Sequence, residues 1–127
     1  MTPMASTVLL VEDDPDIQLI TRLALRKSGF NVNVVSNGRQ ALEAVRATAP
    51  DLVLLDWMMP ELDGLETCRH LKADPATSRI PVIFLTAKSQ EQEIARGMAL
   101  GATGYITKPF DALGLGKQIR DLLPDLG

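Results

Sequence analysis

Five short apolar segments alternate with five amphipathic ones along the chain, and this alternation limits the possible folds more than any other feature. Three of the apolar segments read VLLV, LVLL and VIFL. Continuous apolar runs of this kind are typical of parallel strands that are covered on both faces. The segments NVNVV and GYIT are more mixed, which is typical of edge strands. We predict strands at Thr7–Val11, Asn31–Val35, Leu52–Leu55, Pro81–Leu85 and Gly104–Thr107.

A helix is predicted after each strand, with its ends marked by capping residues, glycine or proline. In the first helix, Ile17, Ile20 and Ala24 are predicted to face the core. In the last, Gly114 and Gly116 are each predicted to weaken the first turns by about 1 kcal/mol relative to alanine. The predicted helices run from Asp14 to Gly29, from Gly38 to Thr48, from Gly64 to Ala73, from a capping box at Ser89 and Gln92 to Gly101, and from Asp111 through Leu115, Ile119 and Leu122.

Strict alternation of strands and helices predicts an α/β fold with a parallel sheet and helices on both faces. Right-handed connections and the three central runs favour a doubly wound (βα)5 flavodoxin-like domain with a five-stranded sheet of order 2-1-3-4-5. The chain has 127 residues, which fits one domain. We assign residues 7–124 to that domain and residues 1–6 to a flexible N-terminal arm.

Composition excludes several classes of protein. The formal net charge of −3 argues against nucleic-acid binding through a basic face. The single cysteine, Cys68, allows neither an intramolecular disulfide nor a cysteine-based zinc site. The first residues do not read as a signal peptide, and the apolar runs are too short to cross a membrane. We therefore expect a cytoplasmic protein without a membrane partner.

Polar side chains follow four of the five predicted strands. Ligands of doubly wound sheets bind at the carboxyl ends of the strands, and the proposed order makes these four strands contiguous. We therefore expect the polar groups to converge in one crevice. They are Glu12, Asp13 and Asp14 after the first strand, Asp56 after the third, Thr86 after the fourth and Lys108 after the fifth.

Several carboxylates can ionise side by side only if a cation offsets their repulsion, and Mg²⁺ prefers oxygen ligands. A phosphoryl group in transfer is stabilised by surrounding carboxylate, Mg²⁺, lysine and hydroxyl groups. A carboxylate can itself be the nucleophile that accepts it.

Each of these residues also has an ordinary structural interpretation when it is taken alone. We expect Asp14 to act as an N-cap, Cys68 to be an inert core thiol and His70 to lie on a solvated helix face. Trp57 is expected to lie partly exposed near the mouth of the crevice. The functional interpretation depends on all the polar groups falling at matching ends of neighbouring strands.

Four stretches carry a family resemblance: VLLVEDD, DLVLLDWMMPELDG, IPVIFLTA and GATGYITKPF. They resemble the receiver domain of two-component response regulators, including chemotaxis regulators, from about Thr7 to Leu123. The resemblance implies that Asp56 is the phosphoacceptor. It also implies Mg²⁺, or Mn²⁺ in its place, held by Asp13, Asp56 and the backbone carbonyl of Met58 with Glu12 in support. Glu12 stands where the family more often has aspartate.

The resemblance assigns roles to further residues. Thr86 and Lys108 would bind the phosphoryl group, and Tyr105 would be the aromatic switch on the fifth strand. The Lys108–Pro109 peptide would be cis and aim the lysine inward. Met58 and Lys88 would tune the attack of water on the phosphorylated aspartate. Gly64 matches a glycine that follows the loop after Asp56.

A receiver domain would take its phosphoryl group from a sensor histidine kinase or a histidine phosphotransfer protein. It would catalyse only its own phosphorylation and slow self-dephosphorylation, and would not be a metabolic enzyme. Its fourth helix, fifth strand and fifth helix would control a downstream effector protein or form a homodimer. Both a stand-alone receiver and a receiver within a larger regulator or hybrid kinase fit the sequence.

Three alternatives fit the residues less well. An aspartyl-phosphate phosphatase or mutase usually has a second aspartate two residues after the nucleophile, where this chain has Met58. A flavin-binding module would have a phosphate loop rich in serine, threonine and glycine after the first strand, where this chain has three acids. A degenerate receiver that serves only for docking is disfavoured because every expected site position is filled.

Overall fold

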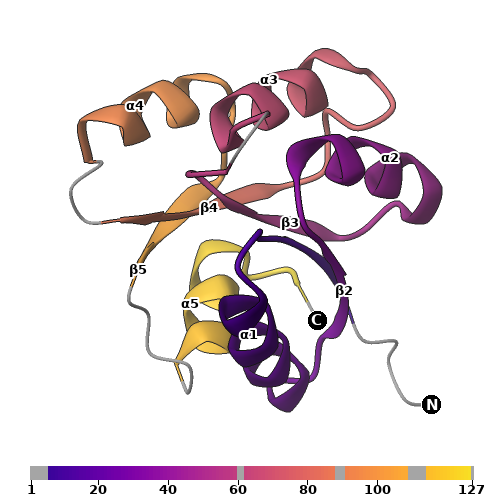
Figure 1. Cartoon of the computed structure of the whole chain (residues 1–127), viewed down its shortest axis with the longest axis vertical. Helices are drawn as coiled ribbons and strands as arrows, with labels where there is room; N and C mark the ends of the chain where they lie inside the picture. Colours follow the sequence, from indigo (N-terminus) through magenta and orange to yellow (C-terminus); the bar gives the residue numbers. More distant parts are fainter. Residues whose placement is uncertain (1–5, 60–61, 88–90, 109–113, 127) are drawn as a thin grey trace.

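A five-stranded parallel sheet forms the centre of the protein, and the computed structural model describes residues 6–59, 62–87, 91–108 and 114–126. The strand order is β2-β1-β3-β4-β5, which confirms the predicted doubly wound topology (Figure 1). The strands are β1 (Thr7–Val11), β2 (Asn31–Val35), β3 (Leu52–Asp56), β4 (Val82–Ala87) and β5 (Gly104–Lys108).

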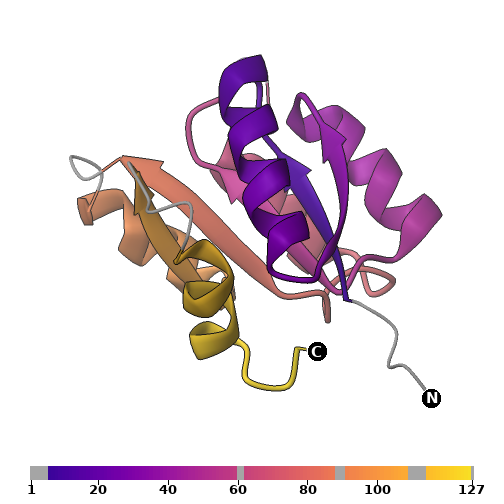
Figure 2. The ribbon, with the colours of Figure 1, turned by 90° about the horizontal axis from the view of Figure 1, so that it is seen from below.

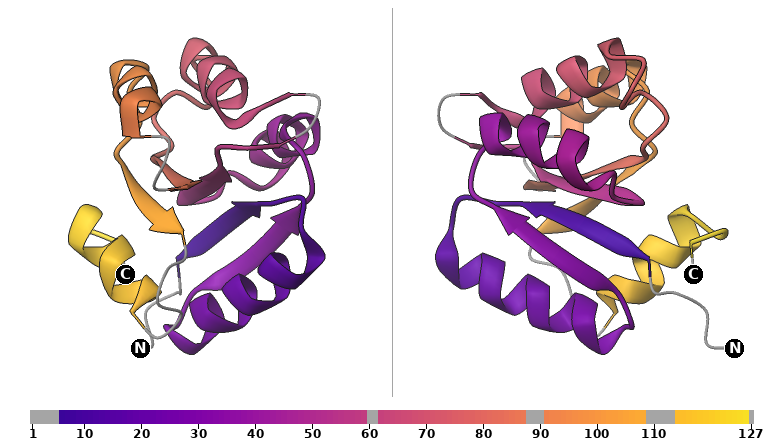
Figure 3. Two further views of the ribbon diagram at one scale, coloured as in Figure 1. Left: turned by 60° about the vertical axis from the view of Figure 1, so that its left-hand side comes forward. Right: turned by 90° about the vertical axis from the view of Figure 1, so that its right-hand side faces the viewer.

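Helices cover both faces of this sheet (Figure 3). Three of them lie on one face, and two lie side by side on the other, one beside β1 and β2 and one beside β5 (Figure 2). The helices of the first face are α2 (Gly38–Thr48), α3 (Gly64–Ala73) and α4 (Glu91–Ala99), and those of the second are α1 (Pro15–Lys27) and α5 (Leu115–Leu122). None of the described helices combines the length and apolarity that crossing a bilayer requires.

The alternating side chains of the central strands divide the core into two layers. Leu9 and Leu55 pack under α2 and α3, whereas Leu10 and Leu54 pack against α1 and α5. The described side chains of β3 and β4 are buried, as the continuous apolar runs predicted, whereas β2 at the edge is only partly buried.

Capping residues set the described helix ends near their predicted positions. The carboxylate of Asp14 accepts hydrogen bonds from the backbone N–H groups of Asp16 at 2.8 Å and Ile17 at 3.4 Å, which confirms its N-cap role. Gly29 follows α1 with a φ of 94°, a left-handed conformation that favours glycine. The predicted capping box of α4 includes Ser89, which lies outside the described residues.

The buried face of α1 agrees with the prediction at Ala24 and differs from it at Ile20. Thr21 and Leu25 are fully buried, whereas Ile20 is 54% exposed. Thr21 and Leu25 have the same i, i+4 spacing as Ile20 and Ala24, displaced by one residue. The buried stripe of α1 thus consists of Thr21, Ala24 and Leu25, so the prediction is confirmed for Ala24 and wrong for Ile20.

Gly116 has a packing role that its low helix propensity concealed. A Cβ atom at this position would lie 2.2 Å from the Oγ atom and 2.4 Å from the Cβ atom of Ser28, at the end of α1. The absent side chain lets α5 pack closely on α1. Arg120 of α5 also donates a hydrogen bond to the Ser28 carbonyl, and its guanidinium lies 4.6 Å from the centre of the Phe30 ring.

We predict that Gly116→Ala lowers the free energy of unfolding by about 1–3 kcal/mol, because the added methyl group overpacks the contact with Ser28. Helix propensity alone would raise it by about 1 kcal/mol. Urea unfolding followed by circular dichroism measures the difference. The control is Gln118→Ala at an exposed position of the same helix, which should change the free energy by less than about 0.5 kcal/mol. Equal or greater stability of Gly116→Ala would contradict this account of the α1–α5 contact.

Candidate functional site

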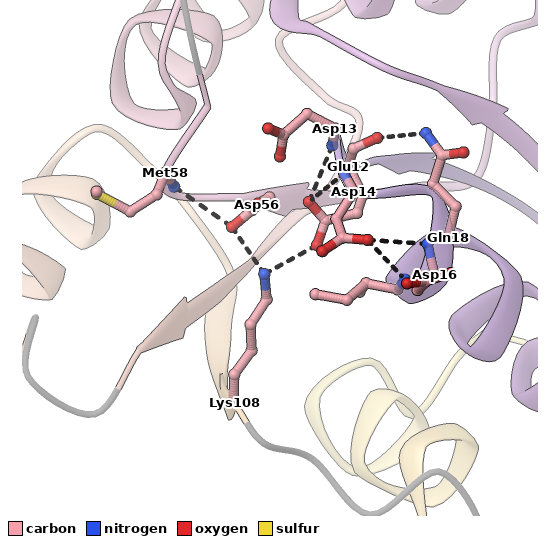
Figure 4. A network of polar contacts seen from close by, with 9 residues as sticks. Glu12, Asp13, Asp14, Asp16, Gln18, Asp56, Met58 and Lys108 are labelled. Carbon is pink, nitrogen blue, oxygen red and sulfur yellow. Dashed lines mark hydrogen bonds and ion pairs between the residues drawn. The ribbon is translucent and has the colours of Figure 1, made fainter.

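Acidic groups from two neighbouring strands and a lysine from the far edge strand meet at the carboxyl end of the sheet (Figure 4). Glu12 and Asp13 follow β1, Asp56 ends β3 and Lys108 ends β5. Carboxylate oxygens of Glu12, Asp13 and Asp56 lie within 4.8 Å of one another. The convergence predicted from the strand order is therefore present for these four residues, whereas the Asp14 carboxylate caps α1.

The ammonium group of Lys108 joins two of these acids. Its Nζ atom lies 2.9 Å from Oε1 of Glu12 and 3.1 Å from Oδ1 of Asp56. Glu12 is 1% exposed and Asp56 is 4% exposed, so both carboxylates are shielded from solvent. Because β4 and β3 separate β5 from β1, the lysine side chain extends across the end of the sheet to reach Glu12.

Backbone N–H groups bind the same two carboxylates. Oε2 of Glu12 accepts a hydrogen bond of 2.9 Å from the N–H of Asp13, and Oδ1 of Asp56 accepts one of 3.3 Å from the N–H of Met58. Glu12 thus uses one oxygen for the turn after β1 and the other for Lys108. These contacts fix the orientation of both acids (Figure 4).

The charges in the site perturb one another. Burial is the main cause that raises the pKa of Glu12, and the neighbouring Asp56 raises it further while Lys108 opposes the shift. Burial also tends to lower the pKa of Lys108, but the carboxylates of Glu12 and Asp56 outweigh this effect and raise that pKa. Desolvation and Glu12 raise the pKa of Asp13. For both acids burial is the largest cause of the raised pKa, and the neighbouring carboxylate adds to it.

The acidic cluster could hold a divalent metal ion. Oxygens that share one Mg²⁺ at about 2.0–2.1 Å lie roughly 3–4 Å apart, so the three carboxylates are close to the required spacing. Asp13 is exposed and can adjust its rotamer, whereas Asp56 is fixed by its contacts with Lys108 and Met58. A cation would relieve the repulsion that raises the pKa of Glu12 and Asp13.

Three further predicted site residues lie on β4, on β5 and in the loop after β3. Thr86 lies in β4 and is 1% exposed, and Tyr105 lies in β5 and is 44% exposed. The side chain of Met58 is 65% exposed in the loop after β3. Lys88 and Pro109 lie outside the described residues, so the dephosphorylation role of one and the cis peptide of the other stay predictions.

Trp57 is buried, and the prediction of partial exposure was wrong. It is 6% exposed, and its ring lies edge-on to that of Phe84 with 4.7 Å between the ring centres. Strand alternation explains this position, because Trp57 falls on the same face as Val53 and Leu55. A Cβ atom on Gly97 of α4 would lie 3.0 Å from Cζ3 of Trp57, so this ring lies directly beneath the helix.

Gly64 allows α3 to start against the backbone of Asp56. A Cβ atom on Gly64 would lie 2.5 Å from the Asp56 carbonyl oxygen and 2.9 Å from the Cα atom of Trp57. The N–H group of Gly64 donates a hydrogen bond of 3.1 Å to the Trp57 carbonyl. The sequence suggested this glycine only through the family resemblance, and the structure supplies the steric reason for it.

Two residues that were expected to have no role in the site have the burial that was predicted for them. Cys68 is fully buried in the core, and burial raises the pKa of its thiol, which is typical of an unreactive cysteine. His70 is exposed on α3.

Comparison with known proteins agrees with the geometry of the site. Residues 8–120 match the response regulator receiver domain family. The chain is 41% identical over 120 residues to the DNA-binding response regulator MtrA of Mycolicibacterium smegmatis, which covers 94% of this chain and 51% of the relative. The chain therefore spans about half the length of the curated relatives it matches.

Solved receiver domains of histidine kinases have the same fold. One from Syntrophus aciditrophicus is 38% identical, with a TM-score of 0.84 and coverage of 94% of this chain and 91% of that one. Another is the receiver domain of the sensor histidine kinase PA1611 from Pseudomonas aeruginosa, which was solved with magnesium coordinated in its active-site cleft. It is 30% identical to this chain, with a TM-score of 0.85, and the match covers 95% of this chain and 99% of that one. The chain belongs to the receiver domain family of response regulators in two-component signalling.

Proposed function

We propose that this receiver is a phosphoacceptor switch that takes a phosphoryl group onto Asp56 from a sensor histidine kinase or a histidine phosphotransfer protein. The observation that carries the proposal is the position of Asp56, which is buried at the end of β3 between the Lys108 ammonium and the acids after β1. A carboxylate held in this way can act as a nucleophile, and the adjacent cation can stabilise the charge on the incoming group.

In the transfer, a carboxylate oxygen of Asp56 forms a bond to phosphorus. The bond between phosphorus and the histidine nitrogen of the donor breaks, and its electron pair returns to the imidazole ring. Lys108 can pair with the phosphoryl oxygens, because its Nζ atom already lies 3.1 Å from the acceptor carboxylate. The hydroxyl of Thr86 would bind another of these oxygens.

Mg²⁺, or Mn²⁺ in its place, would be held by Asp13, Asp56 and the backbone carbonyl of Met58, with Glu12 beside them. When bound, it supplies positive charge to the phosphoryl oxygens. The acid cluster supports this ligand set, and a receiver of the same fold has magnesium in its cleft.

We place the switch in the cytoplasm and assign it no activity beyond its own phosphorylation and slow self-dephosphorylation. The exposed Met58 side chain has no group that would orient an attacking water, and Lys88 would cover the phosphoryl group. A phosphatase or mutase mechanism would need an acid–base group where Met58 stands.

Phosphorylation of Asp56 is tested by intact-mass spectrometry after incubation with acetyl phosphate. We expect one added phosphoryl group with Mg²⁺, none with EDTA and none in Asp56→Asn, because the amide is not a nucleophile of comparable strength. Asp16→Asn is a matched control at an exposed aspartate of α1 and should be labelled like the parent protein. Labelling of Asp56→Asn to the parent level would contradict the assignment.

The output surface is proposed to be the face formed by α4, β5 and α5, which would bind an effector protein or a second copy of the receiver. Thr86 pairs in register with Thr107, next to the edge residues Tyr105 and Lys108. Movement of Thr86 toward a phosphoryl group would free space for the Tyr105 ring, which is 44% exposed in this arrangement. The DNA-binding function of the relative MtrA lies within a protein about twice as long.

Hydrogen exchange with and without the phosphoryl analogue beryllofluoride tests this surface. We expect the backbone amides of α4, β5 and α5, as well as those of the loops at Asp56, to change their protection from hydrogen exchange. The reason is that the analogue would shift the protein from one packing arrangement of this face to another. Asp56→Asn with beryllofluoride is the control and should show no change. Protection changes confined to the loops around Asp56 in the parent protein would contradict a switch on this face.

A further inference from the structure

Glu12 is engaged by protein groups at both oxygens of its carboxylate. Oε2 accepts the hydrogen bond of 2.9 Å from the N–H of Asp13, and Oε1 lies 2.9 Å from Nζ of Lys108. The side chain is 1% exposed, so solvent does not compete for it. Asp13, by contrast, is exposed. Of the two acids after β1, Asp13 is therefore the one free to bind a cation directly, and Glu12 acts mainly on the lysine.

Lys108 reaches Glu12 only by crossing over Asp56. The lysine starts from β5, and the strand order places β4 and β3 between β5 and β1. Its ammonium consequently lies 3.1 Å from Oδ1 of Asp56 while it contacts Glu12 (Figure 4). A flexible lysine loses side-chain entropy when it is held in this extended form, and two carboxylates offset that loss better than one.

We infer that Glu12 is a positioning residue that weakens divalent-cation binding by holding the Lys108 ammonium over Asp56. This inference rests on the proposed use of a cation by Asp13 and Asp56. The ammonium and the cation would compete for the same Asp56 carboxylate and would repel each other at this distance. Without the contact to Glu12, the lysine can withdraw toward β5 and solvent.

The length of the Glu12 side chain is decisive in this arrangement. Glu12→Asp keeps the negative charge but shortens the side chain by one methylene, so the carboxylate can no longer keep both the Asp13 N–H and the Lys108 ammonium. The glutamate therefore gives this receiver a resting contact that makes its response depend more strongly on the cation concentration.

A double-mutant cycle on the full chain tests the inference, with Mg²⁺ affinity measured by isothermal titration calorimetry in the absence of any phosphodonor. Lys108→Met should raise the affinity about tenfold, because the competing charge is gone, and Glu12→Asp should raise it about three- to tenfold. In the Lys108→Met background, Glu12→Asp should change it by less than about twofold. Lys117→Met, at an exposed lysine of α5, is the control for lost charge and should match the parent.

Equal effects of Glu12→Asp in both backgrounds would overturn the inference, because Glu12 would then act on the cation directly. A lowered affinity in Glu12→Asp would also overturn it, since the glutamate would then draw the ammonium away from Asp56. If Glu12→Asp does not fold, Glu12→Gln replaces it, and the same non-additivity with Lys108→Met is expected. Labelling of Asp56 by acetyl phosphate in the parent is independent of this cycle, so failure of the inference and failure of the proposed function give different results.

Discussion

The ammonium of Lys108 between the carboxylates of Glu12 and Asp56 is the contact around which this end of the molecule is organised. Two carboxylates can be almost completely buried only when an opposite charge and hydrogen-bond donors accompany them. Lys108 supplies the charge, and the backbone N–H groups of Asp13 and Met58 supply donors. These contacts orient both carboxylates and shield them within a small apolar domain.

The rest of the fold positions these groups. Parallel pairing brings the carboxyl ends of β1, β3 and β5 to the same edge, and helices on both faces exclude water from the strands. Gly64 lets α3 start directly against the backbone of Asp56, and Gly97 lets α4 lie on Trp57. Trp57, which follows Asp56 in the chain, therefore lies directly against the helix of the proposed output face.

The sequence was sufficient to predict the strand order and the approximate positions of the strands and helices, because apolar runs mark the strands. It was also sufficient to predict that Asp13, Asp56 and Lys108 converge, because each of them follows or ends a predicted strand. In α1 the prediction was correct for the buried Ala24 and wrong for Ile20, since spacing alone does not choose between Ile20 and Thr21. Trp57 was predicted to be partly exposed, although strand alternation with Leu55 would have indicated its burial. Two contacts could not be predicted from local patterns, because each joins segments that are far apart in the sequence. They are the packing of Gly116 against Ser28 and the ion pair between Lys108 and Glu12.

The most direct test of this account is a crystal structure of the protein with Mg²⁺ and beryllofluoride. The account predicts beryllium bonded to a carboxylate oxygen of Asp56, Mg²⁺ on Asp13 and Asp56, and the Nζ atom of Lys108 turned from Glu12 to a fluoride at about 2.7–3.1 Å. Beryllofluoride bound elsewhere, or a Lys108 side chain that points away from Asp56 in the complex, would contradict it.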